Sequence, residues 1–278
     1  MIASAQLDLE SLIEVELPPL PGVAMRVAAL TQDLDASTRK IADAIGCDPV
    51  LATRVLRAAN SPLYCFQRDI TALPIAVSAL GNETIYSLVF MTAAAEAFTK
   101  GRRTAFERDL WEHSVAVGFA AREIMLLLRL RGLEEGFLCG LLHDIGKLLL
   151  LRHDPISYKQ LIDVNTEDEL LTGESSLYGY THAQVGALAA KRWNLPQEIC
   201  QTIYYHHSPS QADQGILMAR VVDVADSIAA QAGFGVRSSE CNLAEAESVI
   251  ALRLTEEQVE LLIEKTRSGS AEAISILS

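Results

Sequence analysis

The stretch from Phe137 to Leu151 sets the first requirement on the fold of this chain. It is apolar except for His143, Asp144 and Lys147, so a histidine and a carboxylate stand side by side in a segment that must be buried. Neighbouring residues of a helix point about 100° apart, so both side chains can reach one metal ion only where the helix bends or ends. We predict this break at Gly146.

Two interpretations of the His143-Asp144 doublet compete at this point. A buried charged pair costs several kcal/mol unless something compensates it, and a bound metal ion is one compensation. The other interpretation is a core histidine beside an Asp144 that pairs with Lys147 three residues later. Because short motifs match often by chance, the doublet alone does not separate the two.

The composition favours packed helices. Half of the 278 residues are hydrophobic and only 6% are aromatic, so the core must be built mainly from Leu, Ala, Val and Ile. A chain of this length can form one large or two ordinary domains. Segments of alternating polarity are short and β-branched residues are dispersed, so the predicted fold class is all-α.

Prolines, glycines and capping residues divide the chain into helices. The segment Leu17–Gly22 is extended, because its prolines lack amide donors and restrict the residues before them. We predict a lead-in over 1–16, an N-terminal helical subdomain over 17–100, a second helical domain over 101–232 and a helical tail over 233–278, with residues 156–180 mixed and partly polar. The predicted helices cover 23–32, 35–46, 48–59, 71–81, 82–98, 105–130, 181–193, 197–207, 214–232, 243–252 and 255–265. A further helix carries the His143-Asp144 doublet and is ended by His153-Asp154-Pro155.

The charge and the cysteines indicate a cytoplasmic protein. The formal charge of −13 argues against non-specific binding to nucleic acid or to an anionic membrane. The amino terminus lacks the basic start and apolar core of a signal peptide, and no apolar run approaches the ~20 residues that span a bilayer. The cysteines contain no CxxC pair and are expected to be reduced, mostly buried thiols: Cys47, Cys65, Cys139, Cys200 and Cys241.

Histidines and aspartates recur on several of the predicted helices. Histidine nitrogens with carboxylate oxygens form the ligand set of iron, manganese, zinc or nickel, and helices of a bundle can aim such groups at one point. Taken singly, each histidine is more often structural or exposed than a ligand. Asp223 and Asp226 lie on an apolar helix, where a carboxylate needs a partner.

The order of these residues resembles the HD superfamily of metal-dependent phosphohydrolases. The defining ligands of that superfamily are a histidine, a His-Asp doublet and a later aspartate, which match His113, His143-Asp144 and Asp226. A fuller set is similar to the two- or three-metal site of HD-GYP phosphodiesterases, with Asp109 where that group commonly has glutamate. It comprises Asp109, His113, His143, Asp144, Lys147, His182, His206, His207 and Asp226.

The front half of the chain resembles the HDOD variety of this superfamily. The matching segments are Leu17–Pro21, Asp48–Leu51, Arg54–Ser61 and Ala76–Gly81, and the resemblance extends over roughly residues 15–232. It implies an N-terminal HDOD subdomain packed on an HD-type helical domain. After His207 the chain has no Gly-Tyr-Pro loop, which speaks against hydrolysis of cyclic di-GMP.

The resemblance implies one to three divalent transition-metal ions (Fe, Mn, Zn or Ni). Asp144 and Lys147 are the catalytic candidates: Lys147 would neutralise a phosphate oxygen or pair with Asp144, and Asp223 would orient a histidine. Many HDOD proteins have lost the ligands and act in signal transduction. Three hypotheses therefore stay open: a regulatory protein with a signalling partner or a nucleotide-type ligand, a phosphohydrolase, and a metal- or redox-responsive sensor.

Overall fold

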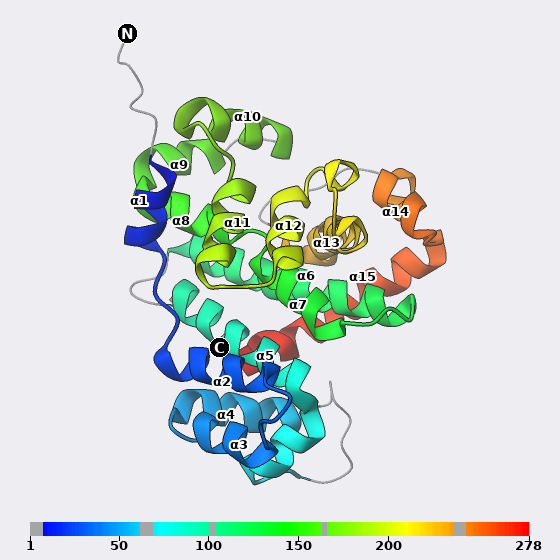
Figure 1. Cartoon of the computed structure of the whole chain (residues 1–278). Coiled ribbons are helices and arrows are strands. Elements are labelled where there is room, and N and C mark those ends of the chain that lie inside the picture. The colour runs from blue at the N-terminus through cyan, green and yellow to red at the C-terminus, as the bar shows by residue number, and fades with distance from the viewer. Residues whose placement is uncertain (1–7, 62–68, 100–103, 163–165, 236–242, 278) are drawn as a thin grey trace. The chain divides into compact units, whose positions relative to one another are not determined.

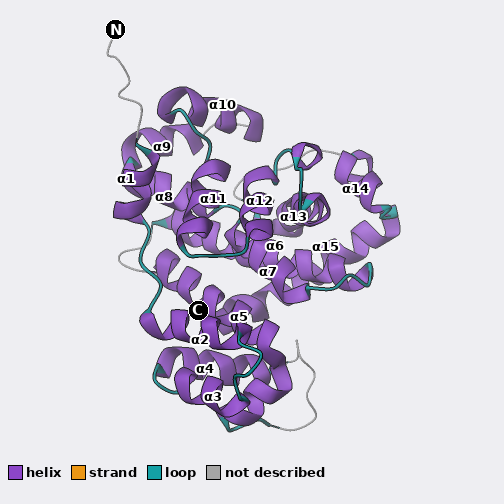
Figure 2. Ribbon diagram, in the orientation of Figure 1, coloured by secondary structure: helices purple, strands orange, loops and turns teal. Residues whose placement is uncertain are grey.

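The computed structural model describes residues 8–61, 69–99, 104–162, 166–235 and 243–277. Every regular element within these residues is a helix (Figure 2), which confirms the all-α prediction. The described residues belong to two compact units, one formed by 1–18 with 101–270 and the other by 19–100 with 271–278. The break predicted at 100–103, together with Cys65 and Cys241, lies outside the described residues.

The smaller unit contains four helices built around α5. They are α2 (Gly22–Gln32), α3 (Thr38–Ile45), α4 (Pro49–Ala59) and α5 (Leu73–Thr99), and the first three pack against α5. The side chains of Ser37 and Asp48 cap α3 and α4 by accepting hydrogen bonds from backbone amides of the first turn. Gly81, with φ +80°, bends α5 between the two helices predicted over 71–81 and 82–98.

One stretch of α5 is long and apolar enough to cross a membrane. Leu73–Phe98 has a mean hydropathy of 1.3 over its most apolar window. This apolar stretch is longer than any that the sequence analysis recognised. The bend at Gly81 and the packing of α2, α3 and α4 against α5 are instead the properties of a core helix.

Two polar residues of the Arg54–Ser61 segment hold the smaller unit together. The guanidinium of Arg54 is buried and donates to the carbonyl oxygen of Thr92 on α5 (3.2 Å). The side-chain amide of Asn60 donates to Leu56 O and Ile70 O (both 2.8 Å) and accepts from Ile70 N (2.7 Å). These contacts explain why the segment needs an arginine and an asparagine at these positions.

The larger unit is a bundle whose centre is formed by α6, α7 and α13 (Figure 1). Helices α6 and α7 approach closely at two glycines, since a Cβ on Gly140 would lie 2.8 Å from the backbone of Gly118. The helices of this unit are α1 (Leu9–Glu16), α6 (Ala105–Leu127), α7 (Leu133–Leu142), α8 (Ile145–His153), α9 (Pro155–Ile162), α10 (Glu167–Tyr178), α11 (His182–Arg192), α12 (Gln197–Tyr205), α13 (Ile216–Ala229), α14 (Glu247–Leu252) and α15 (Glu256–Leu277), whose last residues belong to the smaller unit.

The larger unit also includes segments that the sequence analysis set apart. Helix α1, part of the predicted lead-in, packs on α8 and α11. Helix α15 is joined to α6 by an ion pair between Lys265 Nζ and Glu123 Oε2 (2.8 Å). Helices α9 and α10 occupy the segment 156–180, for which no helix was predicted.

Candidate metal centre

The bend that the doublet requires is present, two residues before its predicted place. Helix α7 ends at Leu142 and α8 begins at Ile145, so His143 and Asp144 form the junction between two helices. Their Nε2 and Oδ2 atoms are 3.4 Å apart. Gly146 has a different role: a Cβ there would lie 1.9 Å from His182 O, so the glycine permits the close approach of α8 and α11.

A first group of candidate ligands contains His113, His143 and Asp144, whose ligand atoms all lie within 4.8 Å of one another. His113 Nε2 from α6 is 3.8 Å from Asp144 Oδ2 and 3.2 Å from Asp226 Oδ1 on α13. The Nδ1 atoms of His113 and His143 face the carbonyl oxygens of Phe234 (3.1 Å) and Gly140 (2.6 Å). These contacts leave Nε2 of each ring for a metal ion.

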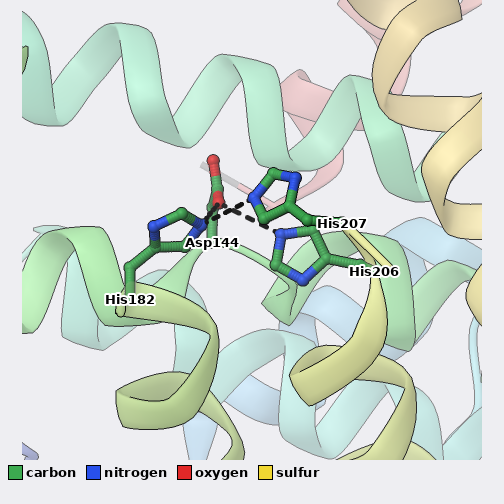
Figure 3. A group of neighbouring side chains, drawn as sticks. All are labelled: Asp144, His182, His206 and His207. Carbon is green, nitrogen blue, oxygen red and sulfur yellow. Dashed lines mark hydrogen bonds and ion pairs between the residues drawn. The ribbon is translucent and has the colours of Figure 1, made fainter. Parts of the chain in front are cut away.

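A second group contains Asp144, His182, His206 and His207 (Figure 3). His182 begins α11, and the two adjacent histidines follow α12. His182 Nε2 is 3.3 Å from Asp144 Oδ1 and 2.9 Å from His207 Nε2, and His206 Nε2 is 3.8 Å from Asp144 Oδ1. Asp144 is thus common to both groups, with Oδ2 facing the first and Oδ1 facing the second.

Three of these atoms are buried polar groups that a bound cation would satisfy. His143 Nε2, His206 Nε2 and Asp144 Oδ1 are buried and have no hydrogen-bond partner among the described residues. Such orphaned polar atoms are costly unless something else satisfies them. Two ligands of one ion with bonds of ~2.1 Å lie ~3.0–4.2 Å apart, close to the spacings observed. The residues therefore fit divalent transition-metal ions.

The protonation states also suit metal binding. Burial, followed by the charges of His143 and His182, lowers the pKa of His206 to about 3. Burial and His206 lower the pKa of His207 well below its usual value, so both rings are neutral at pH 7 and can coordinate. Burial opposes the charge of Asp144, yet His143 and Lys147 outweigh it and hold the pKa of Asp144 well below its usual value.

Lys147 makes the pairing that the sequence analysis offered as an alternative. Its Nζ lies 2.8 Å from Asp144 Oδ2 and 2.9 Å from Glu167 Oε1. Burial disfavours the charge of Lys147, but these two carboxylates outweigh burial and raise its pKa. Lys147 therefore stays a cation at the edge of both groups.

The sequence analysis did not single out Glu174, which orients His182. Glu174 is fully buried on α10, accepts from His182 N (2.7 Å) and Tyr158 Oη (2.6 Å), and lies 2.8 Å from His182 Nδ1. A carboxylate on Nδ1 fixes the tautomer that presents Nε2 to a metal. The sequence signal that could have placed Glu174 on a helix is the pair Thr166 and Glu169, a capping box that marks the start of α10.

Two predicted residues lie elsewhere. Asp109 is 57% exposed, pairs with Arg108 (3.7 Å) and lines a separate cavity of about 940 Å³ that contains none of the clustered histidines. It is one turn from His113 but belongs to neither group. The carboxylate of Asp223 accepts a hydrogen bond from Ser248 on α14 and does not orient a histidine.

Comparison with known proteins agrees with this fold. The HDOD domain family matches residues 17–209. An HDOD domain protein of unknown function from Geobacter sulfurreducens has a TM-score of 0.75 and 26% identity, covering 97% of this chain and 98% of its own. A Shewanella amazonensis protein described as a candidate phosphohydrolase has a TM-score of 0.75 and 25% identity, with 100% of both chains covered.

A curated relative from Treponema pallidum, itself uncharacterised, is 24% identical over 203 residues. The matched region is 72% of this chain but only 39% of that protein, so the chain spans well under two thirds of the relative. The match to the family, in contrast, extends over most of this chain and includes residues 19–100 of the smaller unit and the clustered histidines. The chain belongs to the HDOD domain family.

Proposed function

We propose that this HDOD protein is a metal-dependent phosphohydrolase that acts on a phosphodiester or nucleotide substrate. The observation that carries the proposal is the division of Asp144 between two groups of ligands, one on each carboxylate oxygen. A carboxylate shared in this way suits a pair of ions, the arrangement used for phosphoester hydrolysis. The Shewanella amazonensis relative described as a candidate phosphohydrolase supports the same reaction class.

The chain supplies each part that such a reaction needs. When bound, the ions generate a nucleophile from water at neutral pH and offset the charge that builds on phosphorus. Asp144 belongs to both ligand sets and Lys147 places a cation 2.8 Å from Asp144. The side chains of Asp226 and His207 remain 31% and 17% exposed. The first ion would be held by His113, His143, Asp144 and Asp226, and the second by Asp144, His182, His206 and His207.

The proposal is tested by metal content and hydrolysis together. Protein purified without chelator should carry transition metal, and with added Mn²⁺ it should hydrolyse bis(4-nitrophenyl) phosphate. The double variant His143→Ala, Asp144→Ala should lose both properties, whereas His153→Ala, which changes an exposed histidine at the end of α8, should keep them. Absence of metal from the parent overturns the metal centre, and equal rates in parent and double variant overturn hydrolysis.

A second candidate function is a regulatory protein in signal transduction, with a signalling protein as partner and the ions as structural or sensory elements. The observation in its favour is that Lys147, the cation nearest the ligands, is already held by Asp144 and Glu167. This function predicts stable metal binding without turnover. A change in partner binding when the metal is removed or oxidised would support it.

A further inference from the structure

The acidic start of α10 places Glu167 beside the second group of ligands. We propose that Glu167 is a further ligand of the ion held by His182 and His207, so that α10 completes the second metal position. This inference rests on the proposed metal centre and adds to it a residue outside both groups described above. It also gives a role to the first of the three consecutive acidic residues Glu167, Asp168 and Glu169.

The geometry that supports the inference is a triangle of three ligand atoms. Glu167 Oε1 lies 3.5 Å from His207 Nε2 and 3.8 Å from His182 Nε2, and these two nitrogens are 2.9 Å apart. Ligands bonded at ~2.1 Å to one ion have separations of ~3.0–4.2 Å, which the triangle approaches on every side. Asp144 Oδ1, 3.3 Å from His182 Nε2, adds a fourth atom.

Independent support comes from the buried atoms on the other side of this position. His206 Nε2 and Asp144 Oδ1 are buried without a hydrogen-bond partner among the described residues, and both adjoin the triangle. A cation there would satisfy both of them. Glu167, with a side chain that is 33% exposed, is the most exposed residue of the proposed ligand set.

The start of α10 holds Glu167 in this orientation. Thr166 caps the helix in a capping box with Glu169, and Glu167 is therefore the first helical residue. Lys147 Nζ, 2.9 Å from Glu167 Oε1, draws the carboxylate towards the doublet. Asp168, the next residue, carries the same charge as Glu167, but its side chain is exposed to solvent.

The charges explain why the second position needs this residue. The first position has the carboxylate of Asp226 in addition to its share of Asp144. Without Glu167 the second position would have three imidazoles and only the other oxygen of Asp144. A carboxylate of its own makes the second position comparable in charge to the first, and divalent ions bind more tightly as anionic ligands are added.

Titration of the metal-free protein with Mn²⁺ tests the inference. We expect two ions in the parent, and in Glu167→Gln an unchanged first affinity with at least a tenfold loss at the second position. Asp168→Asn is the matched control and should bind as the parent does. Electron paramagnetic resonance gives a second readout, since the spin coupling of two neighbouring Mn²⁺ ions in the parent should be replaced by an uncoupled signal in Glu167→Gln.

The outcomes separate this inference from the proposed function. A parent that binds no Mn²⁺ overturns the metal centre itself. A parent that binds two ions, with the same two affinities in Glu167→Gln, leaves the metal centre standing and overturns the role of Glu167. Glu167→Asp, which retains the charge but shortens the side chain, should lose less affinity than Glu167→Gln, and the reverse order contradicts direct coordination.

Discussion

Replacement of Gly146 by alanine tests how α8 and α11 are held together beside the metal centre. Gly146 lies in the first turn of α8, two residues after Asp144, and a Cβ there would lie 1.9 Å from His182 O, 2.7 Å from His182 C and 2.9 Å from Gly186 N. All three are backbone atoms, so no side-chain rotation relieves the contact. The two helices would have to separate by about 1.5 Å before the new methyl group reached an ordinary contact of 3.4 Å.

We expect Gly146→Ala to reduce both stability and metal binding. Overpacking of a closely packed core costs ~1–3 kcal/mol, and a contact with rigid backbone belongs in the upper part of this range. For a unit of this size, ~2–3 kcal/mol lowers the melting temperature by about 5–10 °C. The same separation moves His182 away from Asp144, which lies only 3.3 Å from it, so affinity at the second position should fall at least tenfold.

Calorimetry of the metal-free protein and Mn²⁺ titration measure the two effects separately. Gly22→Ala is the matched control, because a Cβ at Gly22 would meet nothing within 4 Å. Its melting temperature and metal affinity should equal or exceed those of the parent. If Gly146→Ala has the same melting temperature and the same Mn²⁺ affinity as the parent, the close approach of α8 and α11 does not position His182, and this reasoning is wrong.

Three further predictions concern residues that are not themselves proposed as metal ligands. Glu174→Gln should weaken metal binding ~10–100-fold, because His182 loses the carboxylate that fixes its tautomer; Mn²⁺ titration measures this, and an unchanged affinity would contradict the role of Glu174. Burial raises the pKa of Asp223 to about 6, against 3.8 for a free carboxyl. The folded state therefore binds an extra proton between these two pH values, and the free energy of unfolding falls as the pH rises through this window. Urea denaturation at several pH values should show that Asp223→Asn removes this slope, and persistence of the slope would assign it to another group. Asn60→Ala should destabilise the smaller unit by ~2–3 kcal/mol, since Ile70 loses partners for both its backbone groups; an equal denaturation midpoint would refute this.

The helices of the smaller unit were largely predictable because local signals and packing agree there. Asp48 followed by Pro49 marks the start of α4, and Gly81 marks the bend of α5. The bend at the doublet was also predictable, because two adjacent ligands cannot point the same way within a helix. Its location was not, because Gly146 is explained by a neighbour in space, His182, that lies far along the chain.

The carboxylates around the metal centre were the hardest part to predict. Asp109 lies one turn from His113, which made it a reasonable candidate, yet its side chain is exposed and pairs with Arg108. Glu167 and Glu174 lie in a polar segment that looks like the solvated face of a helix. Only the packing of α10 near α8 and α11 brings Glu174 into the interior and Glu167 beside Lys147. The histidines were easier because few side chains other than histidine supply a neutral nitrogen ligand.

If both groups bind an ion as proposed, the division of Asp144 between them would keep the two metal occupancies from varying independently. The first ion would take up part of the carboxylate's negative charge and stop its rotation, so the second would meet a ligand that is better ordered but less anionic. A titration should then show two unequal affinities even if the sets of nitrogens were equivalent. At a limited metal supply, a singly loaded protein would be a distinct third species between the empty and the full forms.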